Sequence, residues 1–138
     1  MSDPSSARTV VLPTTREAPR IARAVVTQLL DGSHPDQDLV DRATLLVSEV
    51  TTNAVIHAQS DQPLRLIAGC RNGELHVEVH DGDPAAPVRR AHGTLSEGGR
   101  GMELLELLAT RHGTTFLGHG KAVWFDLAVP PNGTIQVA

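Results

Sequence analysis

Glu49, Asn53 and His57 follow one another at intervals of four residues. A carboxylate, an amide and an imidazole can bind ligands, and on an α-helix this spacing places them along one line, about 40° apart per step. The line borders an apolar stripe, so the three polar groups should lie at the edge of the buried layer, where a cleft can form. A solvated helix flank gives the same spacing, and the pattern alone leaves both interpretations open.

Asp81 ends a run of alternating residues and falls on its apolar side, together with Leu75, Val77 and Val79. A carboxylate at such a position is costly unless it meets hydrogen-bond donors. It therefore favours a ligand with an amine edge, such as adenine, or a helix N-terminus. The alternative is that Asp81 caps the following turn through its own backbone, as Asp-Gly pairs commonly do.

A glycine-rich turn, Gly98-Gly99-Arg100-Gly101, stands directly before a helical pattern that starts at Met102. Glycines let backbone N–H groups approach a phosphate closely, and a helix N-terminus adds partial positive charge. The turn is neither a Walker sequence nor G-x-G-x-x-G. A phosphate-binding turn and a flexible linker before an ordinary helix both remain open.

His76, Glu78 and His80 lie on the polar side of the strand that precedes Asp81. Histidines and a carboxylate in this arrangement could bind a metal ion. Exposed strand faces are polar by default, however, and we expect no metal site there.

The elements that position these residues follow from the sequence periodicity. Helices are expected over about 15–31, 35–58 and 102–109. Strands are expected over 9–12, 64–70, 75–80, 114–117 and 121–129, with a hairpin turn at Arg71-Asn72-Gly73. The stretch from Asp81 to Gly99 has no period and should be a long loop. This order predicts an α+β fold of two layers, with helices on one face of a mixed, mostly antiparallel sheet.

Length and composition indicate one soluble domain. At 138 residues and 40% hydrophobic content, the chain can bury one core. We expect a disordered N-terminus over 1–8, a single domain over 9–130 and a loose tail over 131–138. A net charge of −4 and 2% aromatic residues argue against direct binding of nucleic acid. The single cysteine, Cys70, and the lack of a signal or membrane-spanning pattern predict a cytoplasmic protein.

Taken in order, these motifs resemble a known superfamily. Glu49-x-x-x-Asn53, Asp81 after a strand, a long loop and Gly99-Arg100-Gly101-Met102 are similar to the N, G1 and G2 boxes of GHKL (histidine-kinase-like) ATPases. Residues 48–58 and 120–127 resemble the anti-sigma-factor serine/threonine kinases within it. The resemblance covers about 9–130 and implies a Bergerat-type ATP-binding fold.

The resemblance also implies cofactors and residue roles. ATP and Mg²⁺ would be the cofactors, with Asn53 coordinating Mg²⁺ and Glu49 acting as the catalytic base toward a serine hydroxyl of a partner protein. Asp81 would accept the adenine amine. The phosphates would be held by the segment Gly99, Arg100, Gly101 and Met102, and the stretch from Asp83 to Gly98 would form a lid.

Two functions follow from these roles. The first is an anti-sigma-factor regulator that binds a sigma factor and phosphorylates an anti-sigma antagonist, with a homodimer suggested by the family and no contact with nucleic acid or membranes. The intact pair of Glu49 and Asn53 favours it. The second is a catalytically inactive, nucleotide-gated binding module that sequesters a transcription regulator. Asp83, where the superfamily has a glycine, and Ala122, matched to a threonine that helps the aspartate reach adenine through water, favour this second function.

Overall fold

The fold is described from a computed structural model. It covers residues 7–32, 36–58, 62–81, 100–117 and 120–130, with 100–102 as backbone alone. Within these ranges the elements are β1 (Ala7–Leu12), α1 (Ala18–Asp31), α2 (Gln37–Ile56), β2 (Leu64–Arg71), β3 (Glu74–His80), α4 (Arg100–Leu108), β4 (Arg111–Leu117) and β5 (Gly120–Ala128).

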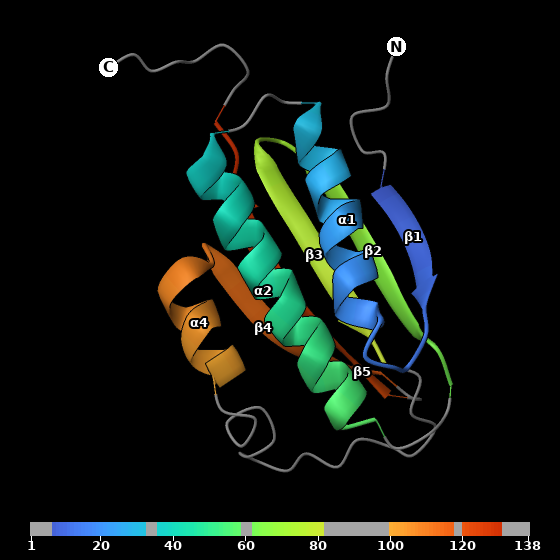
Figure 1. The fold of residues 1–138 in the computed structure, drawn as a ribbon. Helices are drawn as coiled ribbons and strands as arrows, with labels where there is room; N and C mark the ends of the chain where they lie inside the picture. The colour runs from blue at the N-terminus through green and yellow to red at the C-terminus, as the bar shows by residue number, and fades with distance from the viewer. Residues whose placement is uncertain (1–6, 33–35, 59–61, 82–99, 118–119, 131–138) are drawn as a thin grey trace.

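The five strands form one sheet in the order β1-β2-β3-β5-β4 (Figure 1). All four pairings are antiparallel, so the predicted, mostly antiparallel sheet is confirmed. The last strand, β5, lies between β3 and β4. Its pairing with β3 aligns Ala122 with His80. The start of β5 therefore lies beside the end of β3, where the sequence analysis places Asp81.

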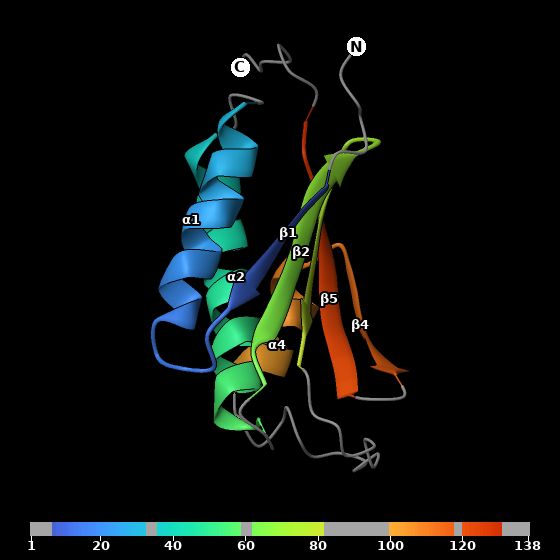
Figure 2. The same cartoon turned by 90° about the vertical axis from the view of Figure 1, so that its right-hand side faces the viewer.

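The three helices cover one face of the sheet, as predicted. Figure 2 shows α1, α2 and α4 together on one side, with α1 packed along α2 and α4 next to the other side of α2. The opposite face of the sheet has no helix over it in the part of the chain that the structure describes. We call this side the open face.

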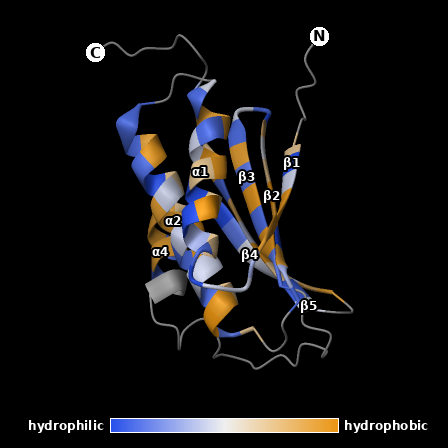
Figure 3. Ribbon diagram, turned by 45° about the vertical axis from the view of Figure 1, so that its right-hand side comes forward, coloured by the Kyte–Doolittle hydropathy of each residue, from blue (hydrophilic) through white to orange (hydrophobic). Residues whose placement is uncertain are grey.

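Strand alternation builds the core between the two layers. On β3, Leu75, Val77 and Val79 are buried beneath the helices, while the residues between them are polar (Figure 3). Phe125 on β5 faces the same way, opposite Val77. Apart from Phe125, the described core consists of aliphatic side chains. The scarcity of aromatic residues therefore leaves a core that depends on close aliphatic packing.

Most elements differ from the predicted ranges by one to three residues at an end, and contacts within the structure account for two of these differences. Helix α2 begins after Asp36, because the Asp36 carboxylate accepts a hydrogen bond from the Leu39 N–H at 2.8 Å. Strand β4 starts three residues early, at Arg111, because Arg111 pairs with Asp126. Strand β1 starts at Ala7, so Ala7 and Arg8 belong to the sheet and not to a disordered N-terminus.

The predicted disorder of the rest of the N-terminus and the predicted loose C-terminal tail concern residues 1–6 and 131–138. These residues lie outside the described part of the chain. None of the helices in the described ranges combines the length and the apolar character that crossing a membrane requires.

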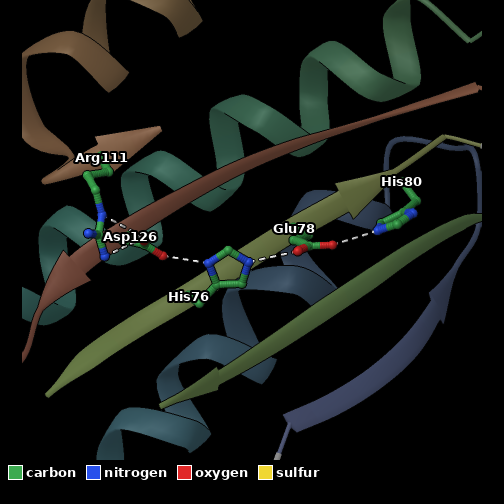
Figure 4. A network of polar contacts seen from close by, with 5 residues as sticks. All are labelled: His76, Glu78, His80, Arg111 and Asp126. Carbon is green, nitrogen blue, oxygen red and sulfur yellow. Dashed lines mark hydrogen bonds and ion pairs between the residues drawn. The ribbon is translucent and has the colours of Figure 1, made fainter. Parts of the chain in front are cut away.

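The open face carries a network of paired charges (Figure 4). His76 Nδ1 is hydrogen-bonded to Asp126, and His76 Nε2 lies 2.8 Å from Glu78 Oε2. The other oxygen of Glu78 lies 2.8 Å from Nε2 of His80. Arg111 donates to Asp126 at 3.2 Å. No group of His, Cys, Asp and Glu among the described residues is arranged to hold a metal ion, and these side chains instead pair with one another.

The network shifts two pKa values in opposite directions. Burial lowers the pKa of His76, but its hydrogen bonds to Glu78 and Asp126 outweigh burial and raise the pKa above its ordinary 6.5. Burial raises the pKa of Glu78, but the two histidines outweigh burial and lower it below its ordinary 4.5. The His76 contribution to stability is lost as pH rises through its raised pKa, and the Glu78 contribution is lost as pH falls through its lowered one. Both contributions to stability are present between pH 4.5 and pH 6.5.

We expect His76→Gln to remove part of the pH dependence of stability. The wild-type free energy of unfolding should fall between about pH 6 and pH 8.5, by less than about 1 kcal/mol from this network because His76 is partly exposed. The free energy of unfolding of the variant should fall less over the same pH range. Urea denaturation at both pH values measures this, with His112→Gln on the helix-covered face as the matched control. Equal pH dependence in wild type and His76→Gln would contradict the assignment.

Candidate functional site

A pocket lies between the last turns of α2 and the adjoining ends of β3 and β5. These parts of the three elements lie at the same end of the molecule (Figure 1). Helix α4 begins at the same end. The pocket is lined by Val50, Asn53, Ala54, His57, Val79, Asp81, Lys121 and Val123. Four of these lining residues are apolar, and the other four carry polar side chains.

Helix α2 brings two of the three aligned polar residues to this pocket. Asn53 is 6% exposed, and both Asn53 and His57 line the pocket. Glu49 is half-buried one helical turn before Asn53 and is not among the lining residues. The predicted edge of the buried layer is therefore where the cleft forms, but only its C-terminal part faces the cleft.

Asp81 is held against β5 by its backbone and its side chain. Its N–H donates to the Lys121 carbonyl at 3.0 Å, and its Oδ1 accepts from the Lys121 N–H at 3.2 Å. Its Oδ2 lies 3.8 Å from Lys121 Nζ, and the Asp81 side chain is 11% exposed. Two short backbone contacts thus fix the direction of a largely buried carboxylate at the pocket wall.

Two buried nitrogen atoms at the pocket have no partner. Asn53 Nδ2 and His57 Nε2 lie out of contact with solvent and form no hydrogen bond in the described part of the chain. Buried polar atoms are almost always paired, and leaving one unpaired costs about 1–3 kcal/mol. A polar ligand in the pocket would offer these atoms the partners that the protein does not.

The glycine turn is only partly described. Gly98 and Gly99 lie outside the described residues, whereas Arg100, Gly101 and Met102 form the first turn of α4 as backbone. The helix starts two residues before the predicted Met102, at the same end of the molecule as the pocket (Figure 1). The first N–H groups of a helix have no partners within it and are suited to anions.

Strand β5 contributes Lys121 and Val123 to the pocket lining, and Ala122 is not among the lining residues. Ala122 pairs with His80, and both lie on the open face of the sheet. Alternation turns Lys121 and Val123 toward the pocket instead. Sequence reasoning missed Lys121, although its alternation with Val123 and Phe125 was the signal that could have found it.

The amino-acid sequence was compared with models of known protein families. The family model described as histidine kinase-like ATPase domain matches residues 12–126, which is most of the chain. The chain belongs to this family. The resemblance to the GHKL superfamily seen in the sequence is thereby confirmed, and the family match indicates an ATP-binding type of domain.

A solved structure shares the fold of this histidine kinase-like ATPase domain. The crystal structure of the RsbU and RsbW domains of Rv1364c from Mycobacterium tuberculosis matches with a TM-score of 0.72 at 18% identity. The match covers 96% of this chain and 34% of that one, so this chain spans about a third of that protein's length. The histidine kinase domain of the blue-light activated histidine kinase from Erythrobacter litoralis EL346 matches with a TM-score of 0.48 at 28% identity, over 65% of this chain and 44% of that one. No curated protein sequence matches.

We expect Asn53→Leu to leave the free energy of unfolding unchanged or to raise it by up to about 1 kcal/mol, because it removes an unpaired buried amide. The matched contrast is Asp126→Leu, which replaces a buried carboxylate that is paired with His76 and Arg111. That change should cost about 1–3 kcal/mol. Urea denaturation of both variants measures the difference. A loss above about 2 kcal/mol in Asn53→Leu would show that the amide serves the fold and not a ligand.

Proposed function

We propose that this histidine kinase-like domain binds ATP in the pocket between α2, β3 and β5. One observation carries the proposal: Asp81 and Asn53, from separate elements, meet on one apolar pocket while the Asn53 amide nitrogen is left unpaired. The Asp81 carboxylate accepts the amine of adenine, and the apolar walls contact the base. The backbone from Gly99 to Met102 holds the phosphates at the start of α4.

The residues present fit a magnesium ion beside the phosphates. Asn53 is buried on the pocket wall, and its amide nitrogen forms no hydrogen bond with any residue that the structure describes. Its amide oxygen is a hard ligand of the kind that Mg²⁺ accepts. Asn53 would hold the ion, and Mg²⁺ when bound would neutralise charge on the phosphate oxygens.

The proposed reaction is transfer of the terminal phosphate to a serine or threonine hydroxyl of a partner protein. Glu49 lies one helical turn before Asn53 on α2 and is half-buried. As the base, it would accept the hydroxyl proton while the oxygen attacks phosphorus and ADP leaves. The likeness of residues 48–58 and 120–127 to anti-sigma-factor kinases supports a sigma factor and an anti-sigma antagonist as partners. The fold shared with the structure that contains an RsbW domain agrees with this proposal. We place the protein in the cytoplasm, with a homodimer as its assembly.

A nucleotide-gated binding module without transfer chemistry is the second candidate. The observation that favours it is the position of Glu49, which does not line the described pocket. Asp83, the other residue that favours this function, lies outside the described residues. Such a module would sequester a transcription regulator and need Asp81 and Asn53 but no base.

We expect Asp81→Asn to weaken ATP binding by at least about tenfold, because a charged acceptor for the adenine amine is replaced by a neutral amide. Isothermal titration of the purified chain with Mg-ATP measures the affinity. The matched control is Asp38→Asn, an exposed carboxylate on α2 that is paired with Arg42. Equal affinity in wild type and Asp81→Asn would rule out the assignment of Asp81 to adenine.

Glu49→Gln separates the kinase from the binding module. It nearly preserves the side-chain shape, so ATP affinity should stay within about twofold, while phosphate transfer should fall by at least about 100-fold because the base is lost. The assay follows radiolabelled phosphate from ATP to the antagonist protein. If the wild-type chain binds ATP and a sigma factor yet transfers no phosphate, the binding module is correct and the kinase is wrong.

A further inference from the structure

Lys121 occupies a position in the pocket that the proposed function does not yet use. It lies on β5 directly beside Asp81, on the same side of the strand as Val123. Its side chain is 24% exposed, so a cationic group lies partly buried at the wall that would contact the base.

The geometry leaves the lysine ammonium available to a third group. Lys121 Nζ lies 3.8 Å from Asp81 Oδ2, which is longer than a hydrogen bond. Within the described ranges no hydrogen bond from Nζ is present, whereas the Lys121 backbone bonds Asp81 on both sides. The carboxylate is therefore fixed by the strand, and the ammonium can move on its flexible stem.

The two side chains together present one acceptor next to one donor. An ionised Asp side chain only accepts hydrogen bonds, and a Lys ammonium only donates them. The edge of adenine presents the complement, since the 6-amino group donates and the neighbouring ring nitrogen N1 accepts. The amino group and N1 are neighbours on the base, so their two partners must also be neighbours. Asp81 Oδ2 and Lys121 Nζ, 3.8 Å apart, meet this requirement.

We propose that Lys121 is a specificity-determining residue that donates from Nζ to N1 of adenine while Asp81 accepts from the 6-amino group. This inference rests on the proposed function, namely that ATP binds in this pocket. It adds that the base is recognised by direct, charge-assisted contact on two atoms. A bond with one charged partner is stronger than a neutral one, so the N1 contact should account for at least about tenfold in affinity.

The first arm of the test changes the ligand and leaves the protein intact. In 1-deaza-ATP a C–H group replaces N1, while the 6-amino group and the phosphates remain. The wild-type chain should bind 1-deaza-ATP at least about tenfold more weakly than ATP in an isothermal titration. Equal affinity for the two nucleotides would overturn the inference, and so would tighter binding of GTP than of ATP.

The second arm changes the protein. Lys121→Met keeps the stem length without the donor, so it should lose at least about tenfold in ATP affinity and bind ATP and 1-deaza-ATP equally. The matched control for the lost charge is Arg65→Met, because Arg65 is exposed on the open face and pairs with His80 across the strands. It should retain both the wild-type affinity and the preference for ATP.

The outcomes distinguish a failure of the Lys121 inference from a failure of the proposed function. If wild type binds no ATP, the proposed function fails and this inference fails with it. If wild type binds ATP but Lys121→Met binds it equally or more tightly, the ion pair only competes with the base, and the inference alone is overturned. Should Lys121→Met not fold, as judged by thermal unfolding, the 1-deaza-ATP arm on wild type still decides.

Discussion

Helices α1 and α2 bury one face of the sheet, and strand alternation against this single covered face determines where every side chain of β3 and β5 points. Leu75, Val77 and Val79 enter the core, and His76 and Glu78 are left on the open face. The open face then stabilises its polar side chains by pairing them with one another.

The site forms where this cover ends. Helix α2 finishes at Ile56 above the adjoining ends of β3 and β5, so the last apolar turn of the helix gives way to a pocket. Asn53 and Asp81 lie at that border, buried enough to be rigid yet directed into space that a ligand can fill. Among the described residues Asn53 Nδ2 has no hydrogen-bond partner, and a polar ligand in the pocket would supply one.

The sequence predicted those features that depend on local periodicity. The alternation in β3 and the stripe on α2 identified the elements, and the tight turn at Asn72-Gly73, with both residues at positive φ, formed as expected. Alternation puts Lys121 on the same face as Val123 and Phe125, but its position beside Asp81 depends on the pairing of β5 with β3, which the sequence pattern does not supply. Strand β4 was predicted too short for a related reason: its first residues are polar, and pairing with β5 makes them a strand.

The most direct test of the account is a titration of the isotope-labelled chain with Mg-ATP followed by NMR. Because Val50, Val79 and Val123 line the pocket, their methyl signals should shift, together with the ring signals of His57. Val11, exposed on the open face, should not shift. Shifts confined to the open face, or none at saturating ATP, would contradict the claim that this pocket is the nucleotide site.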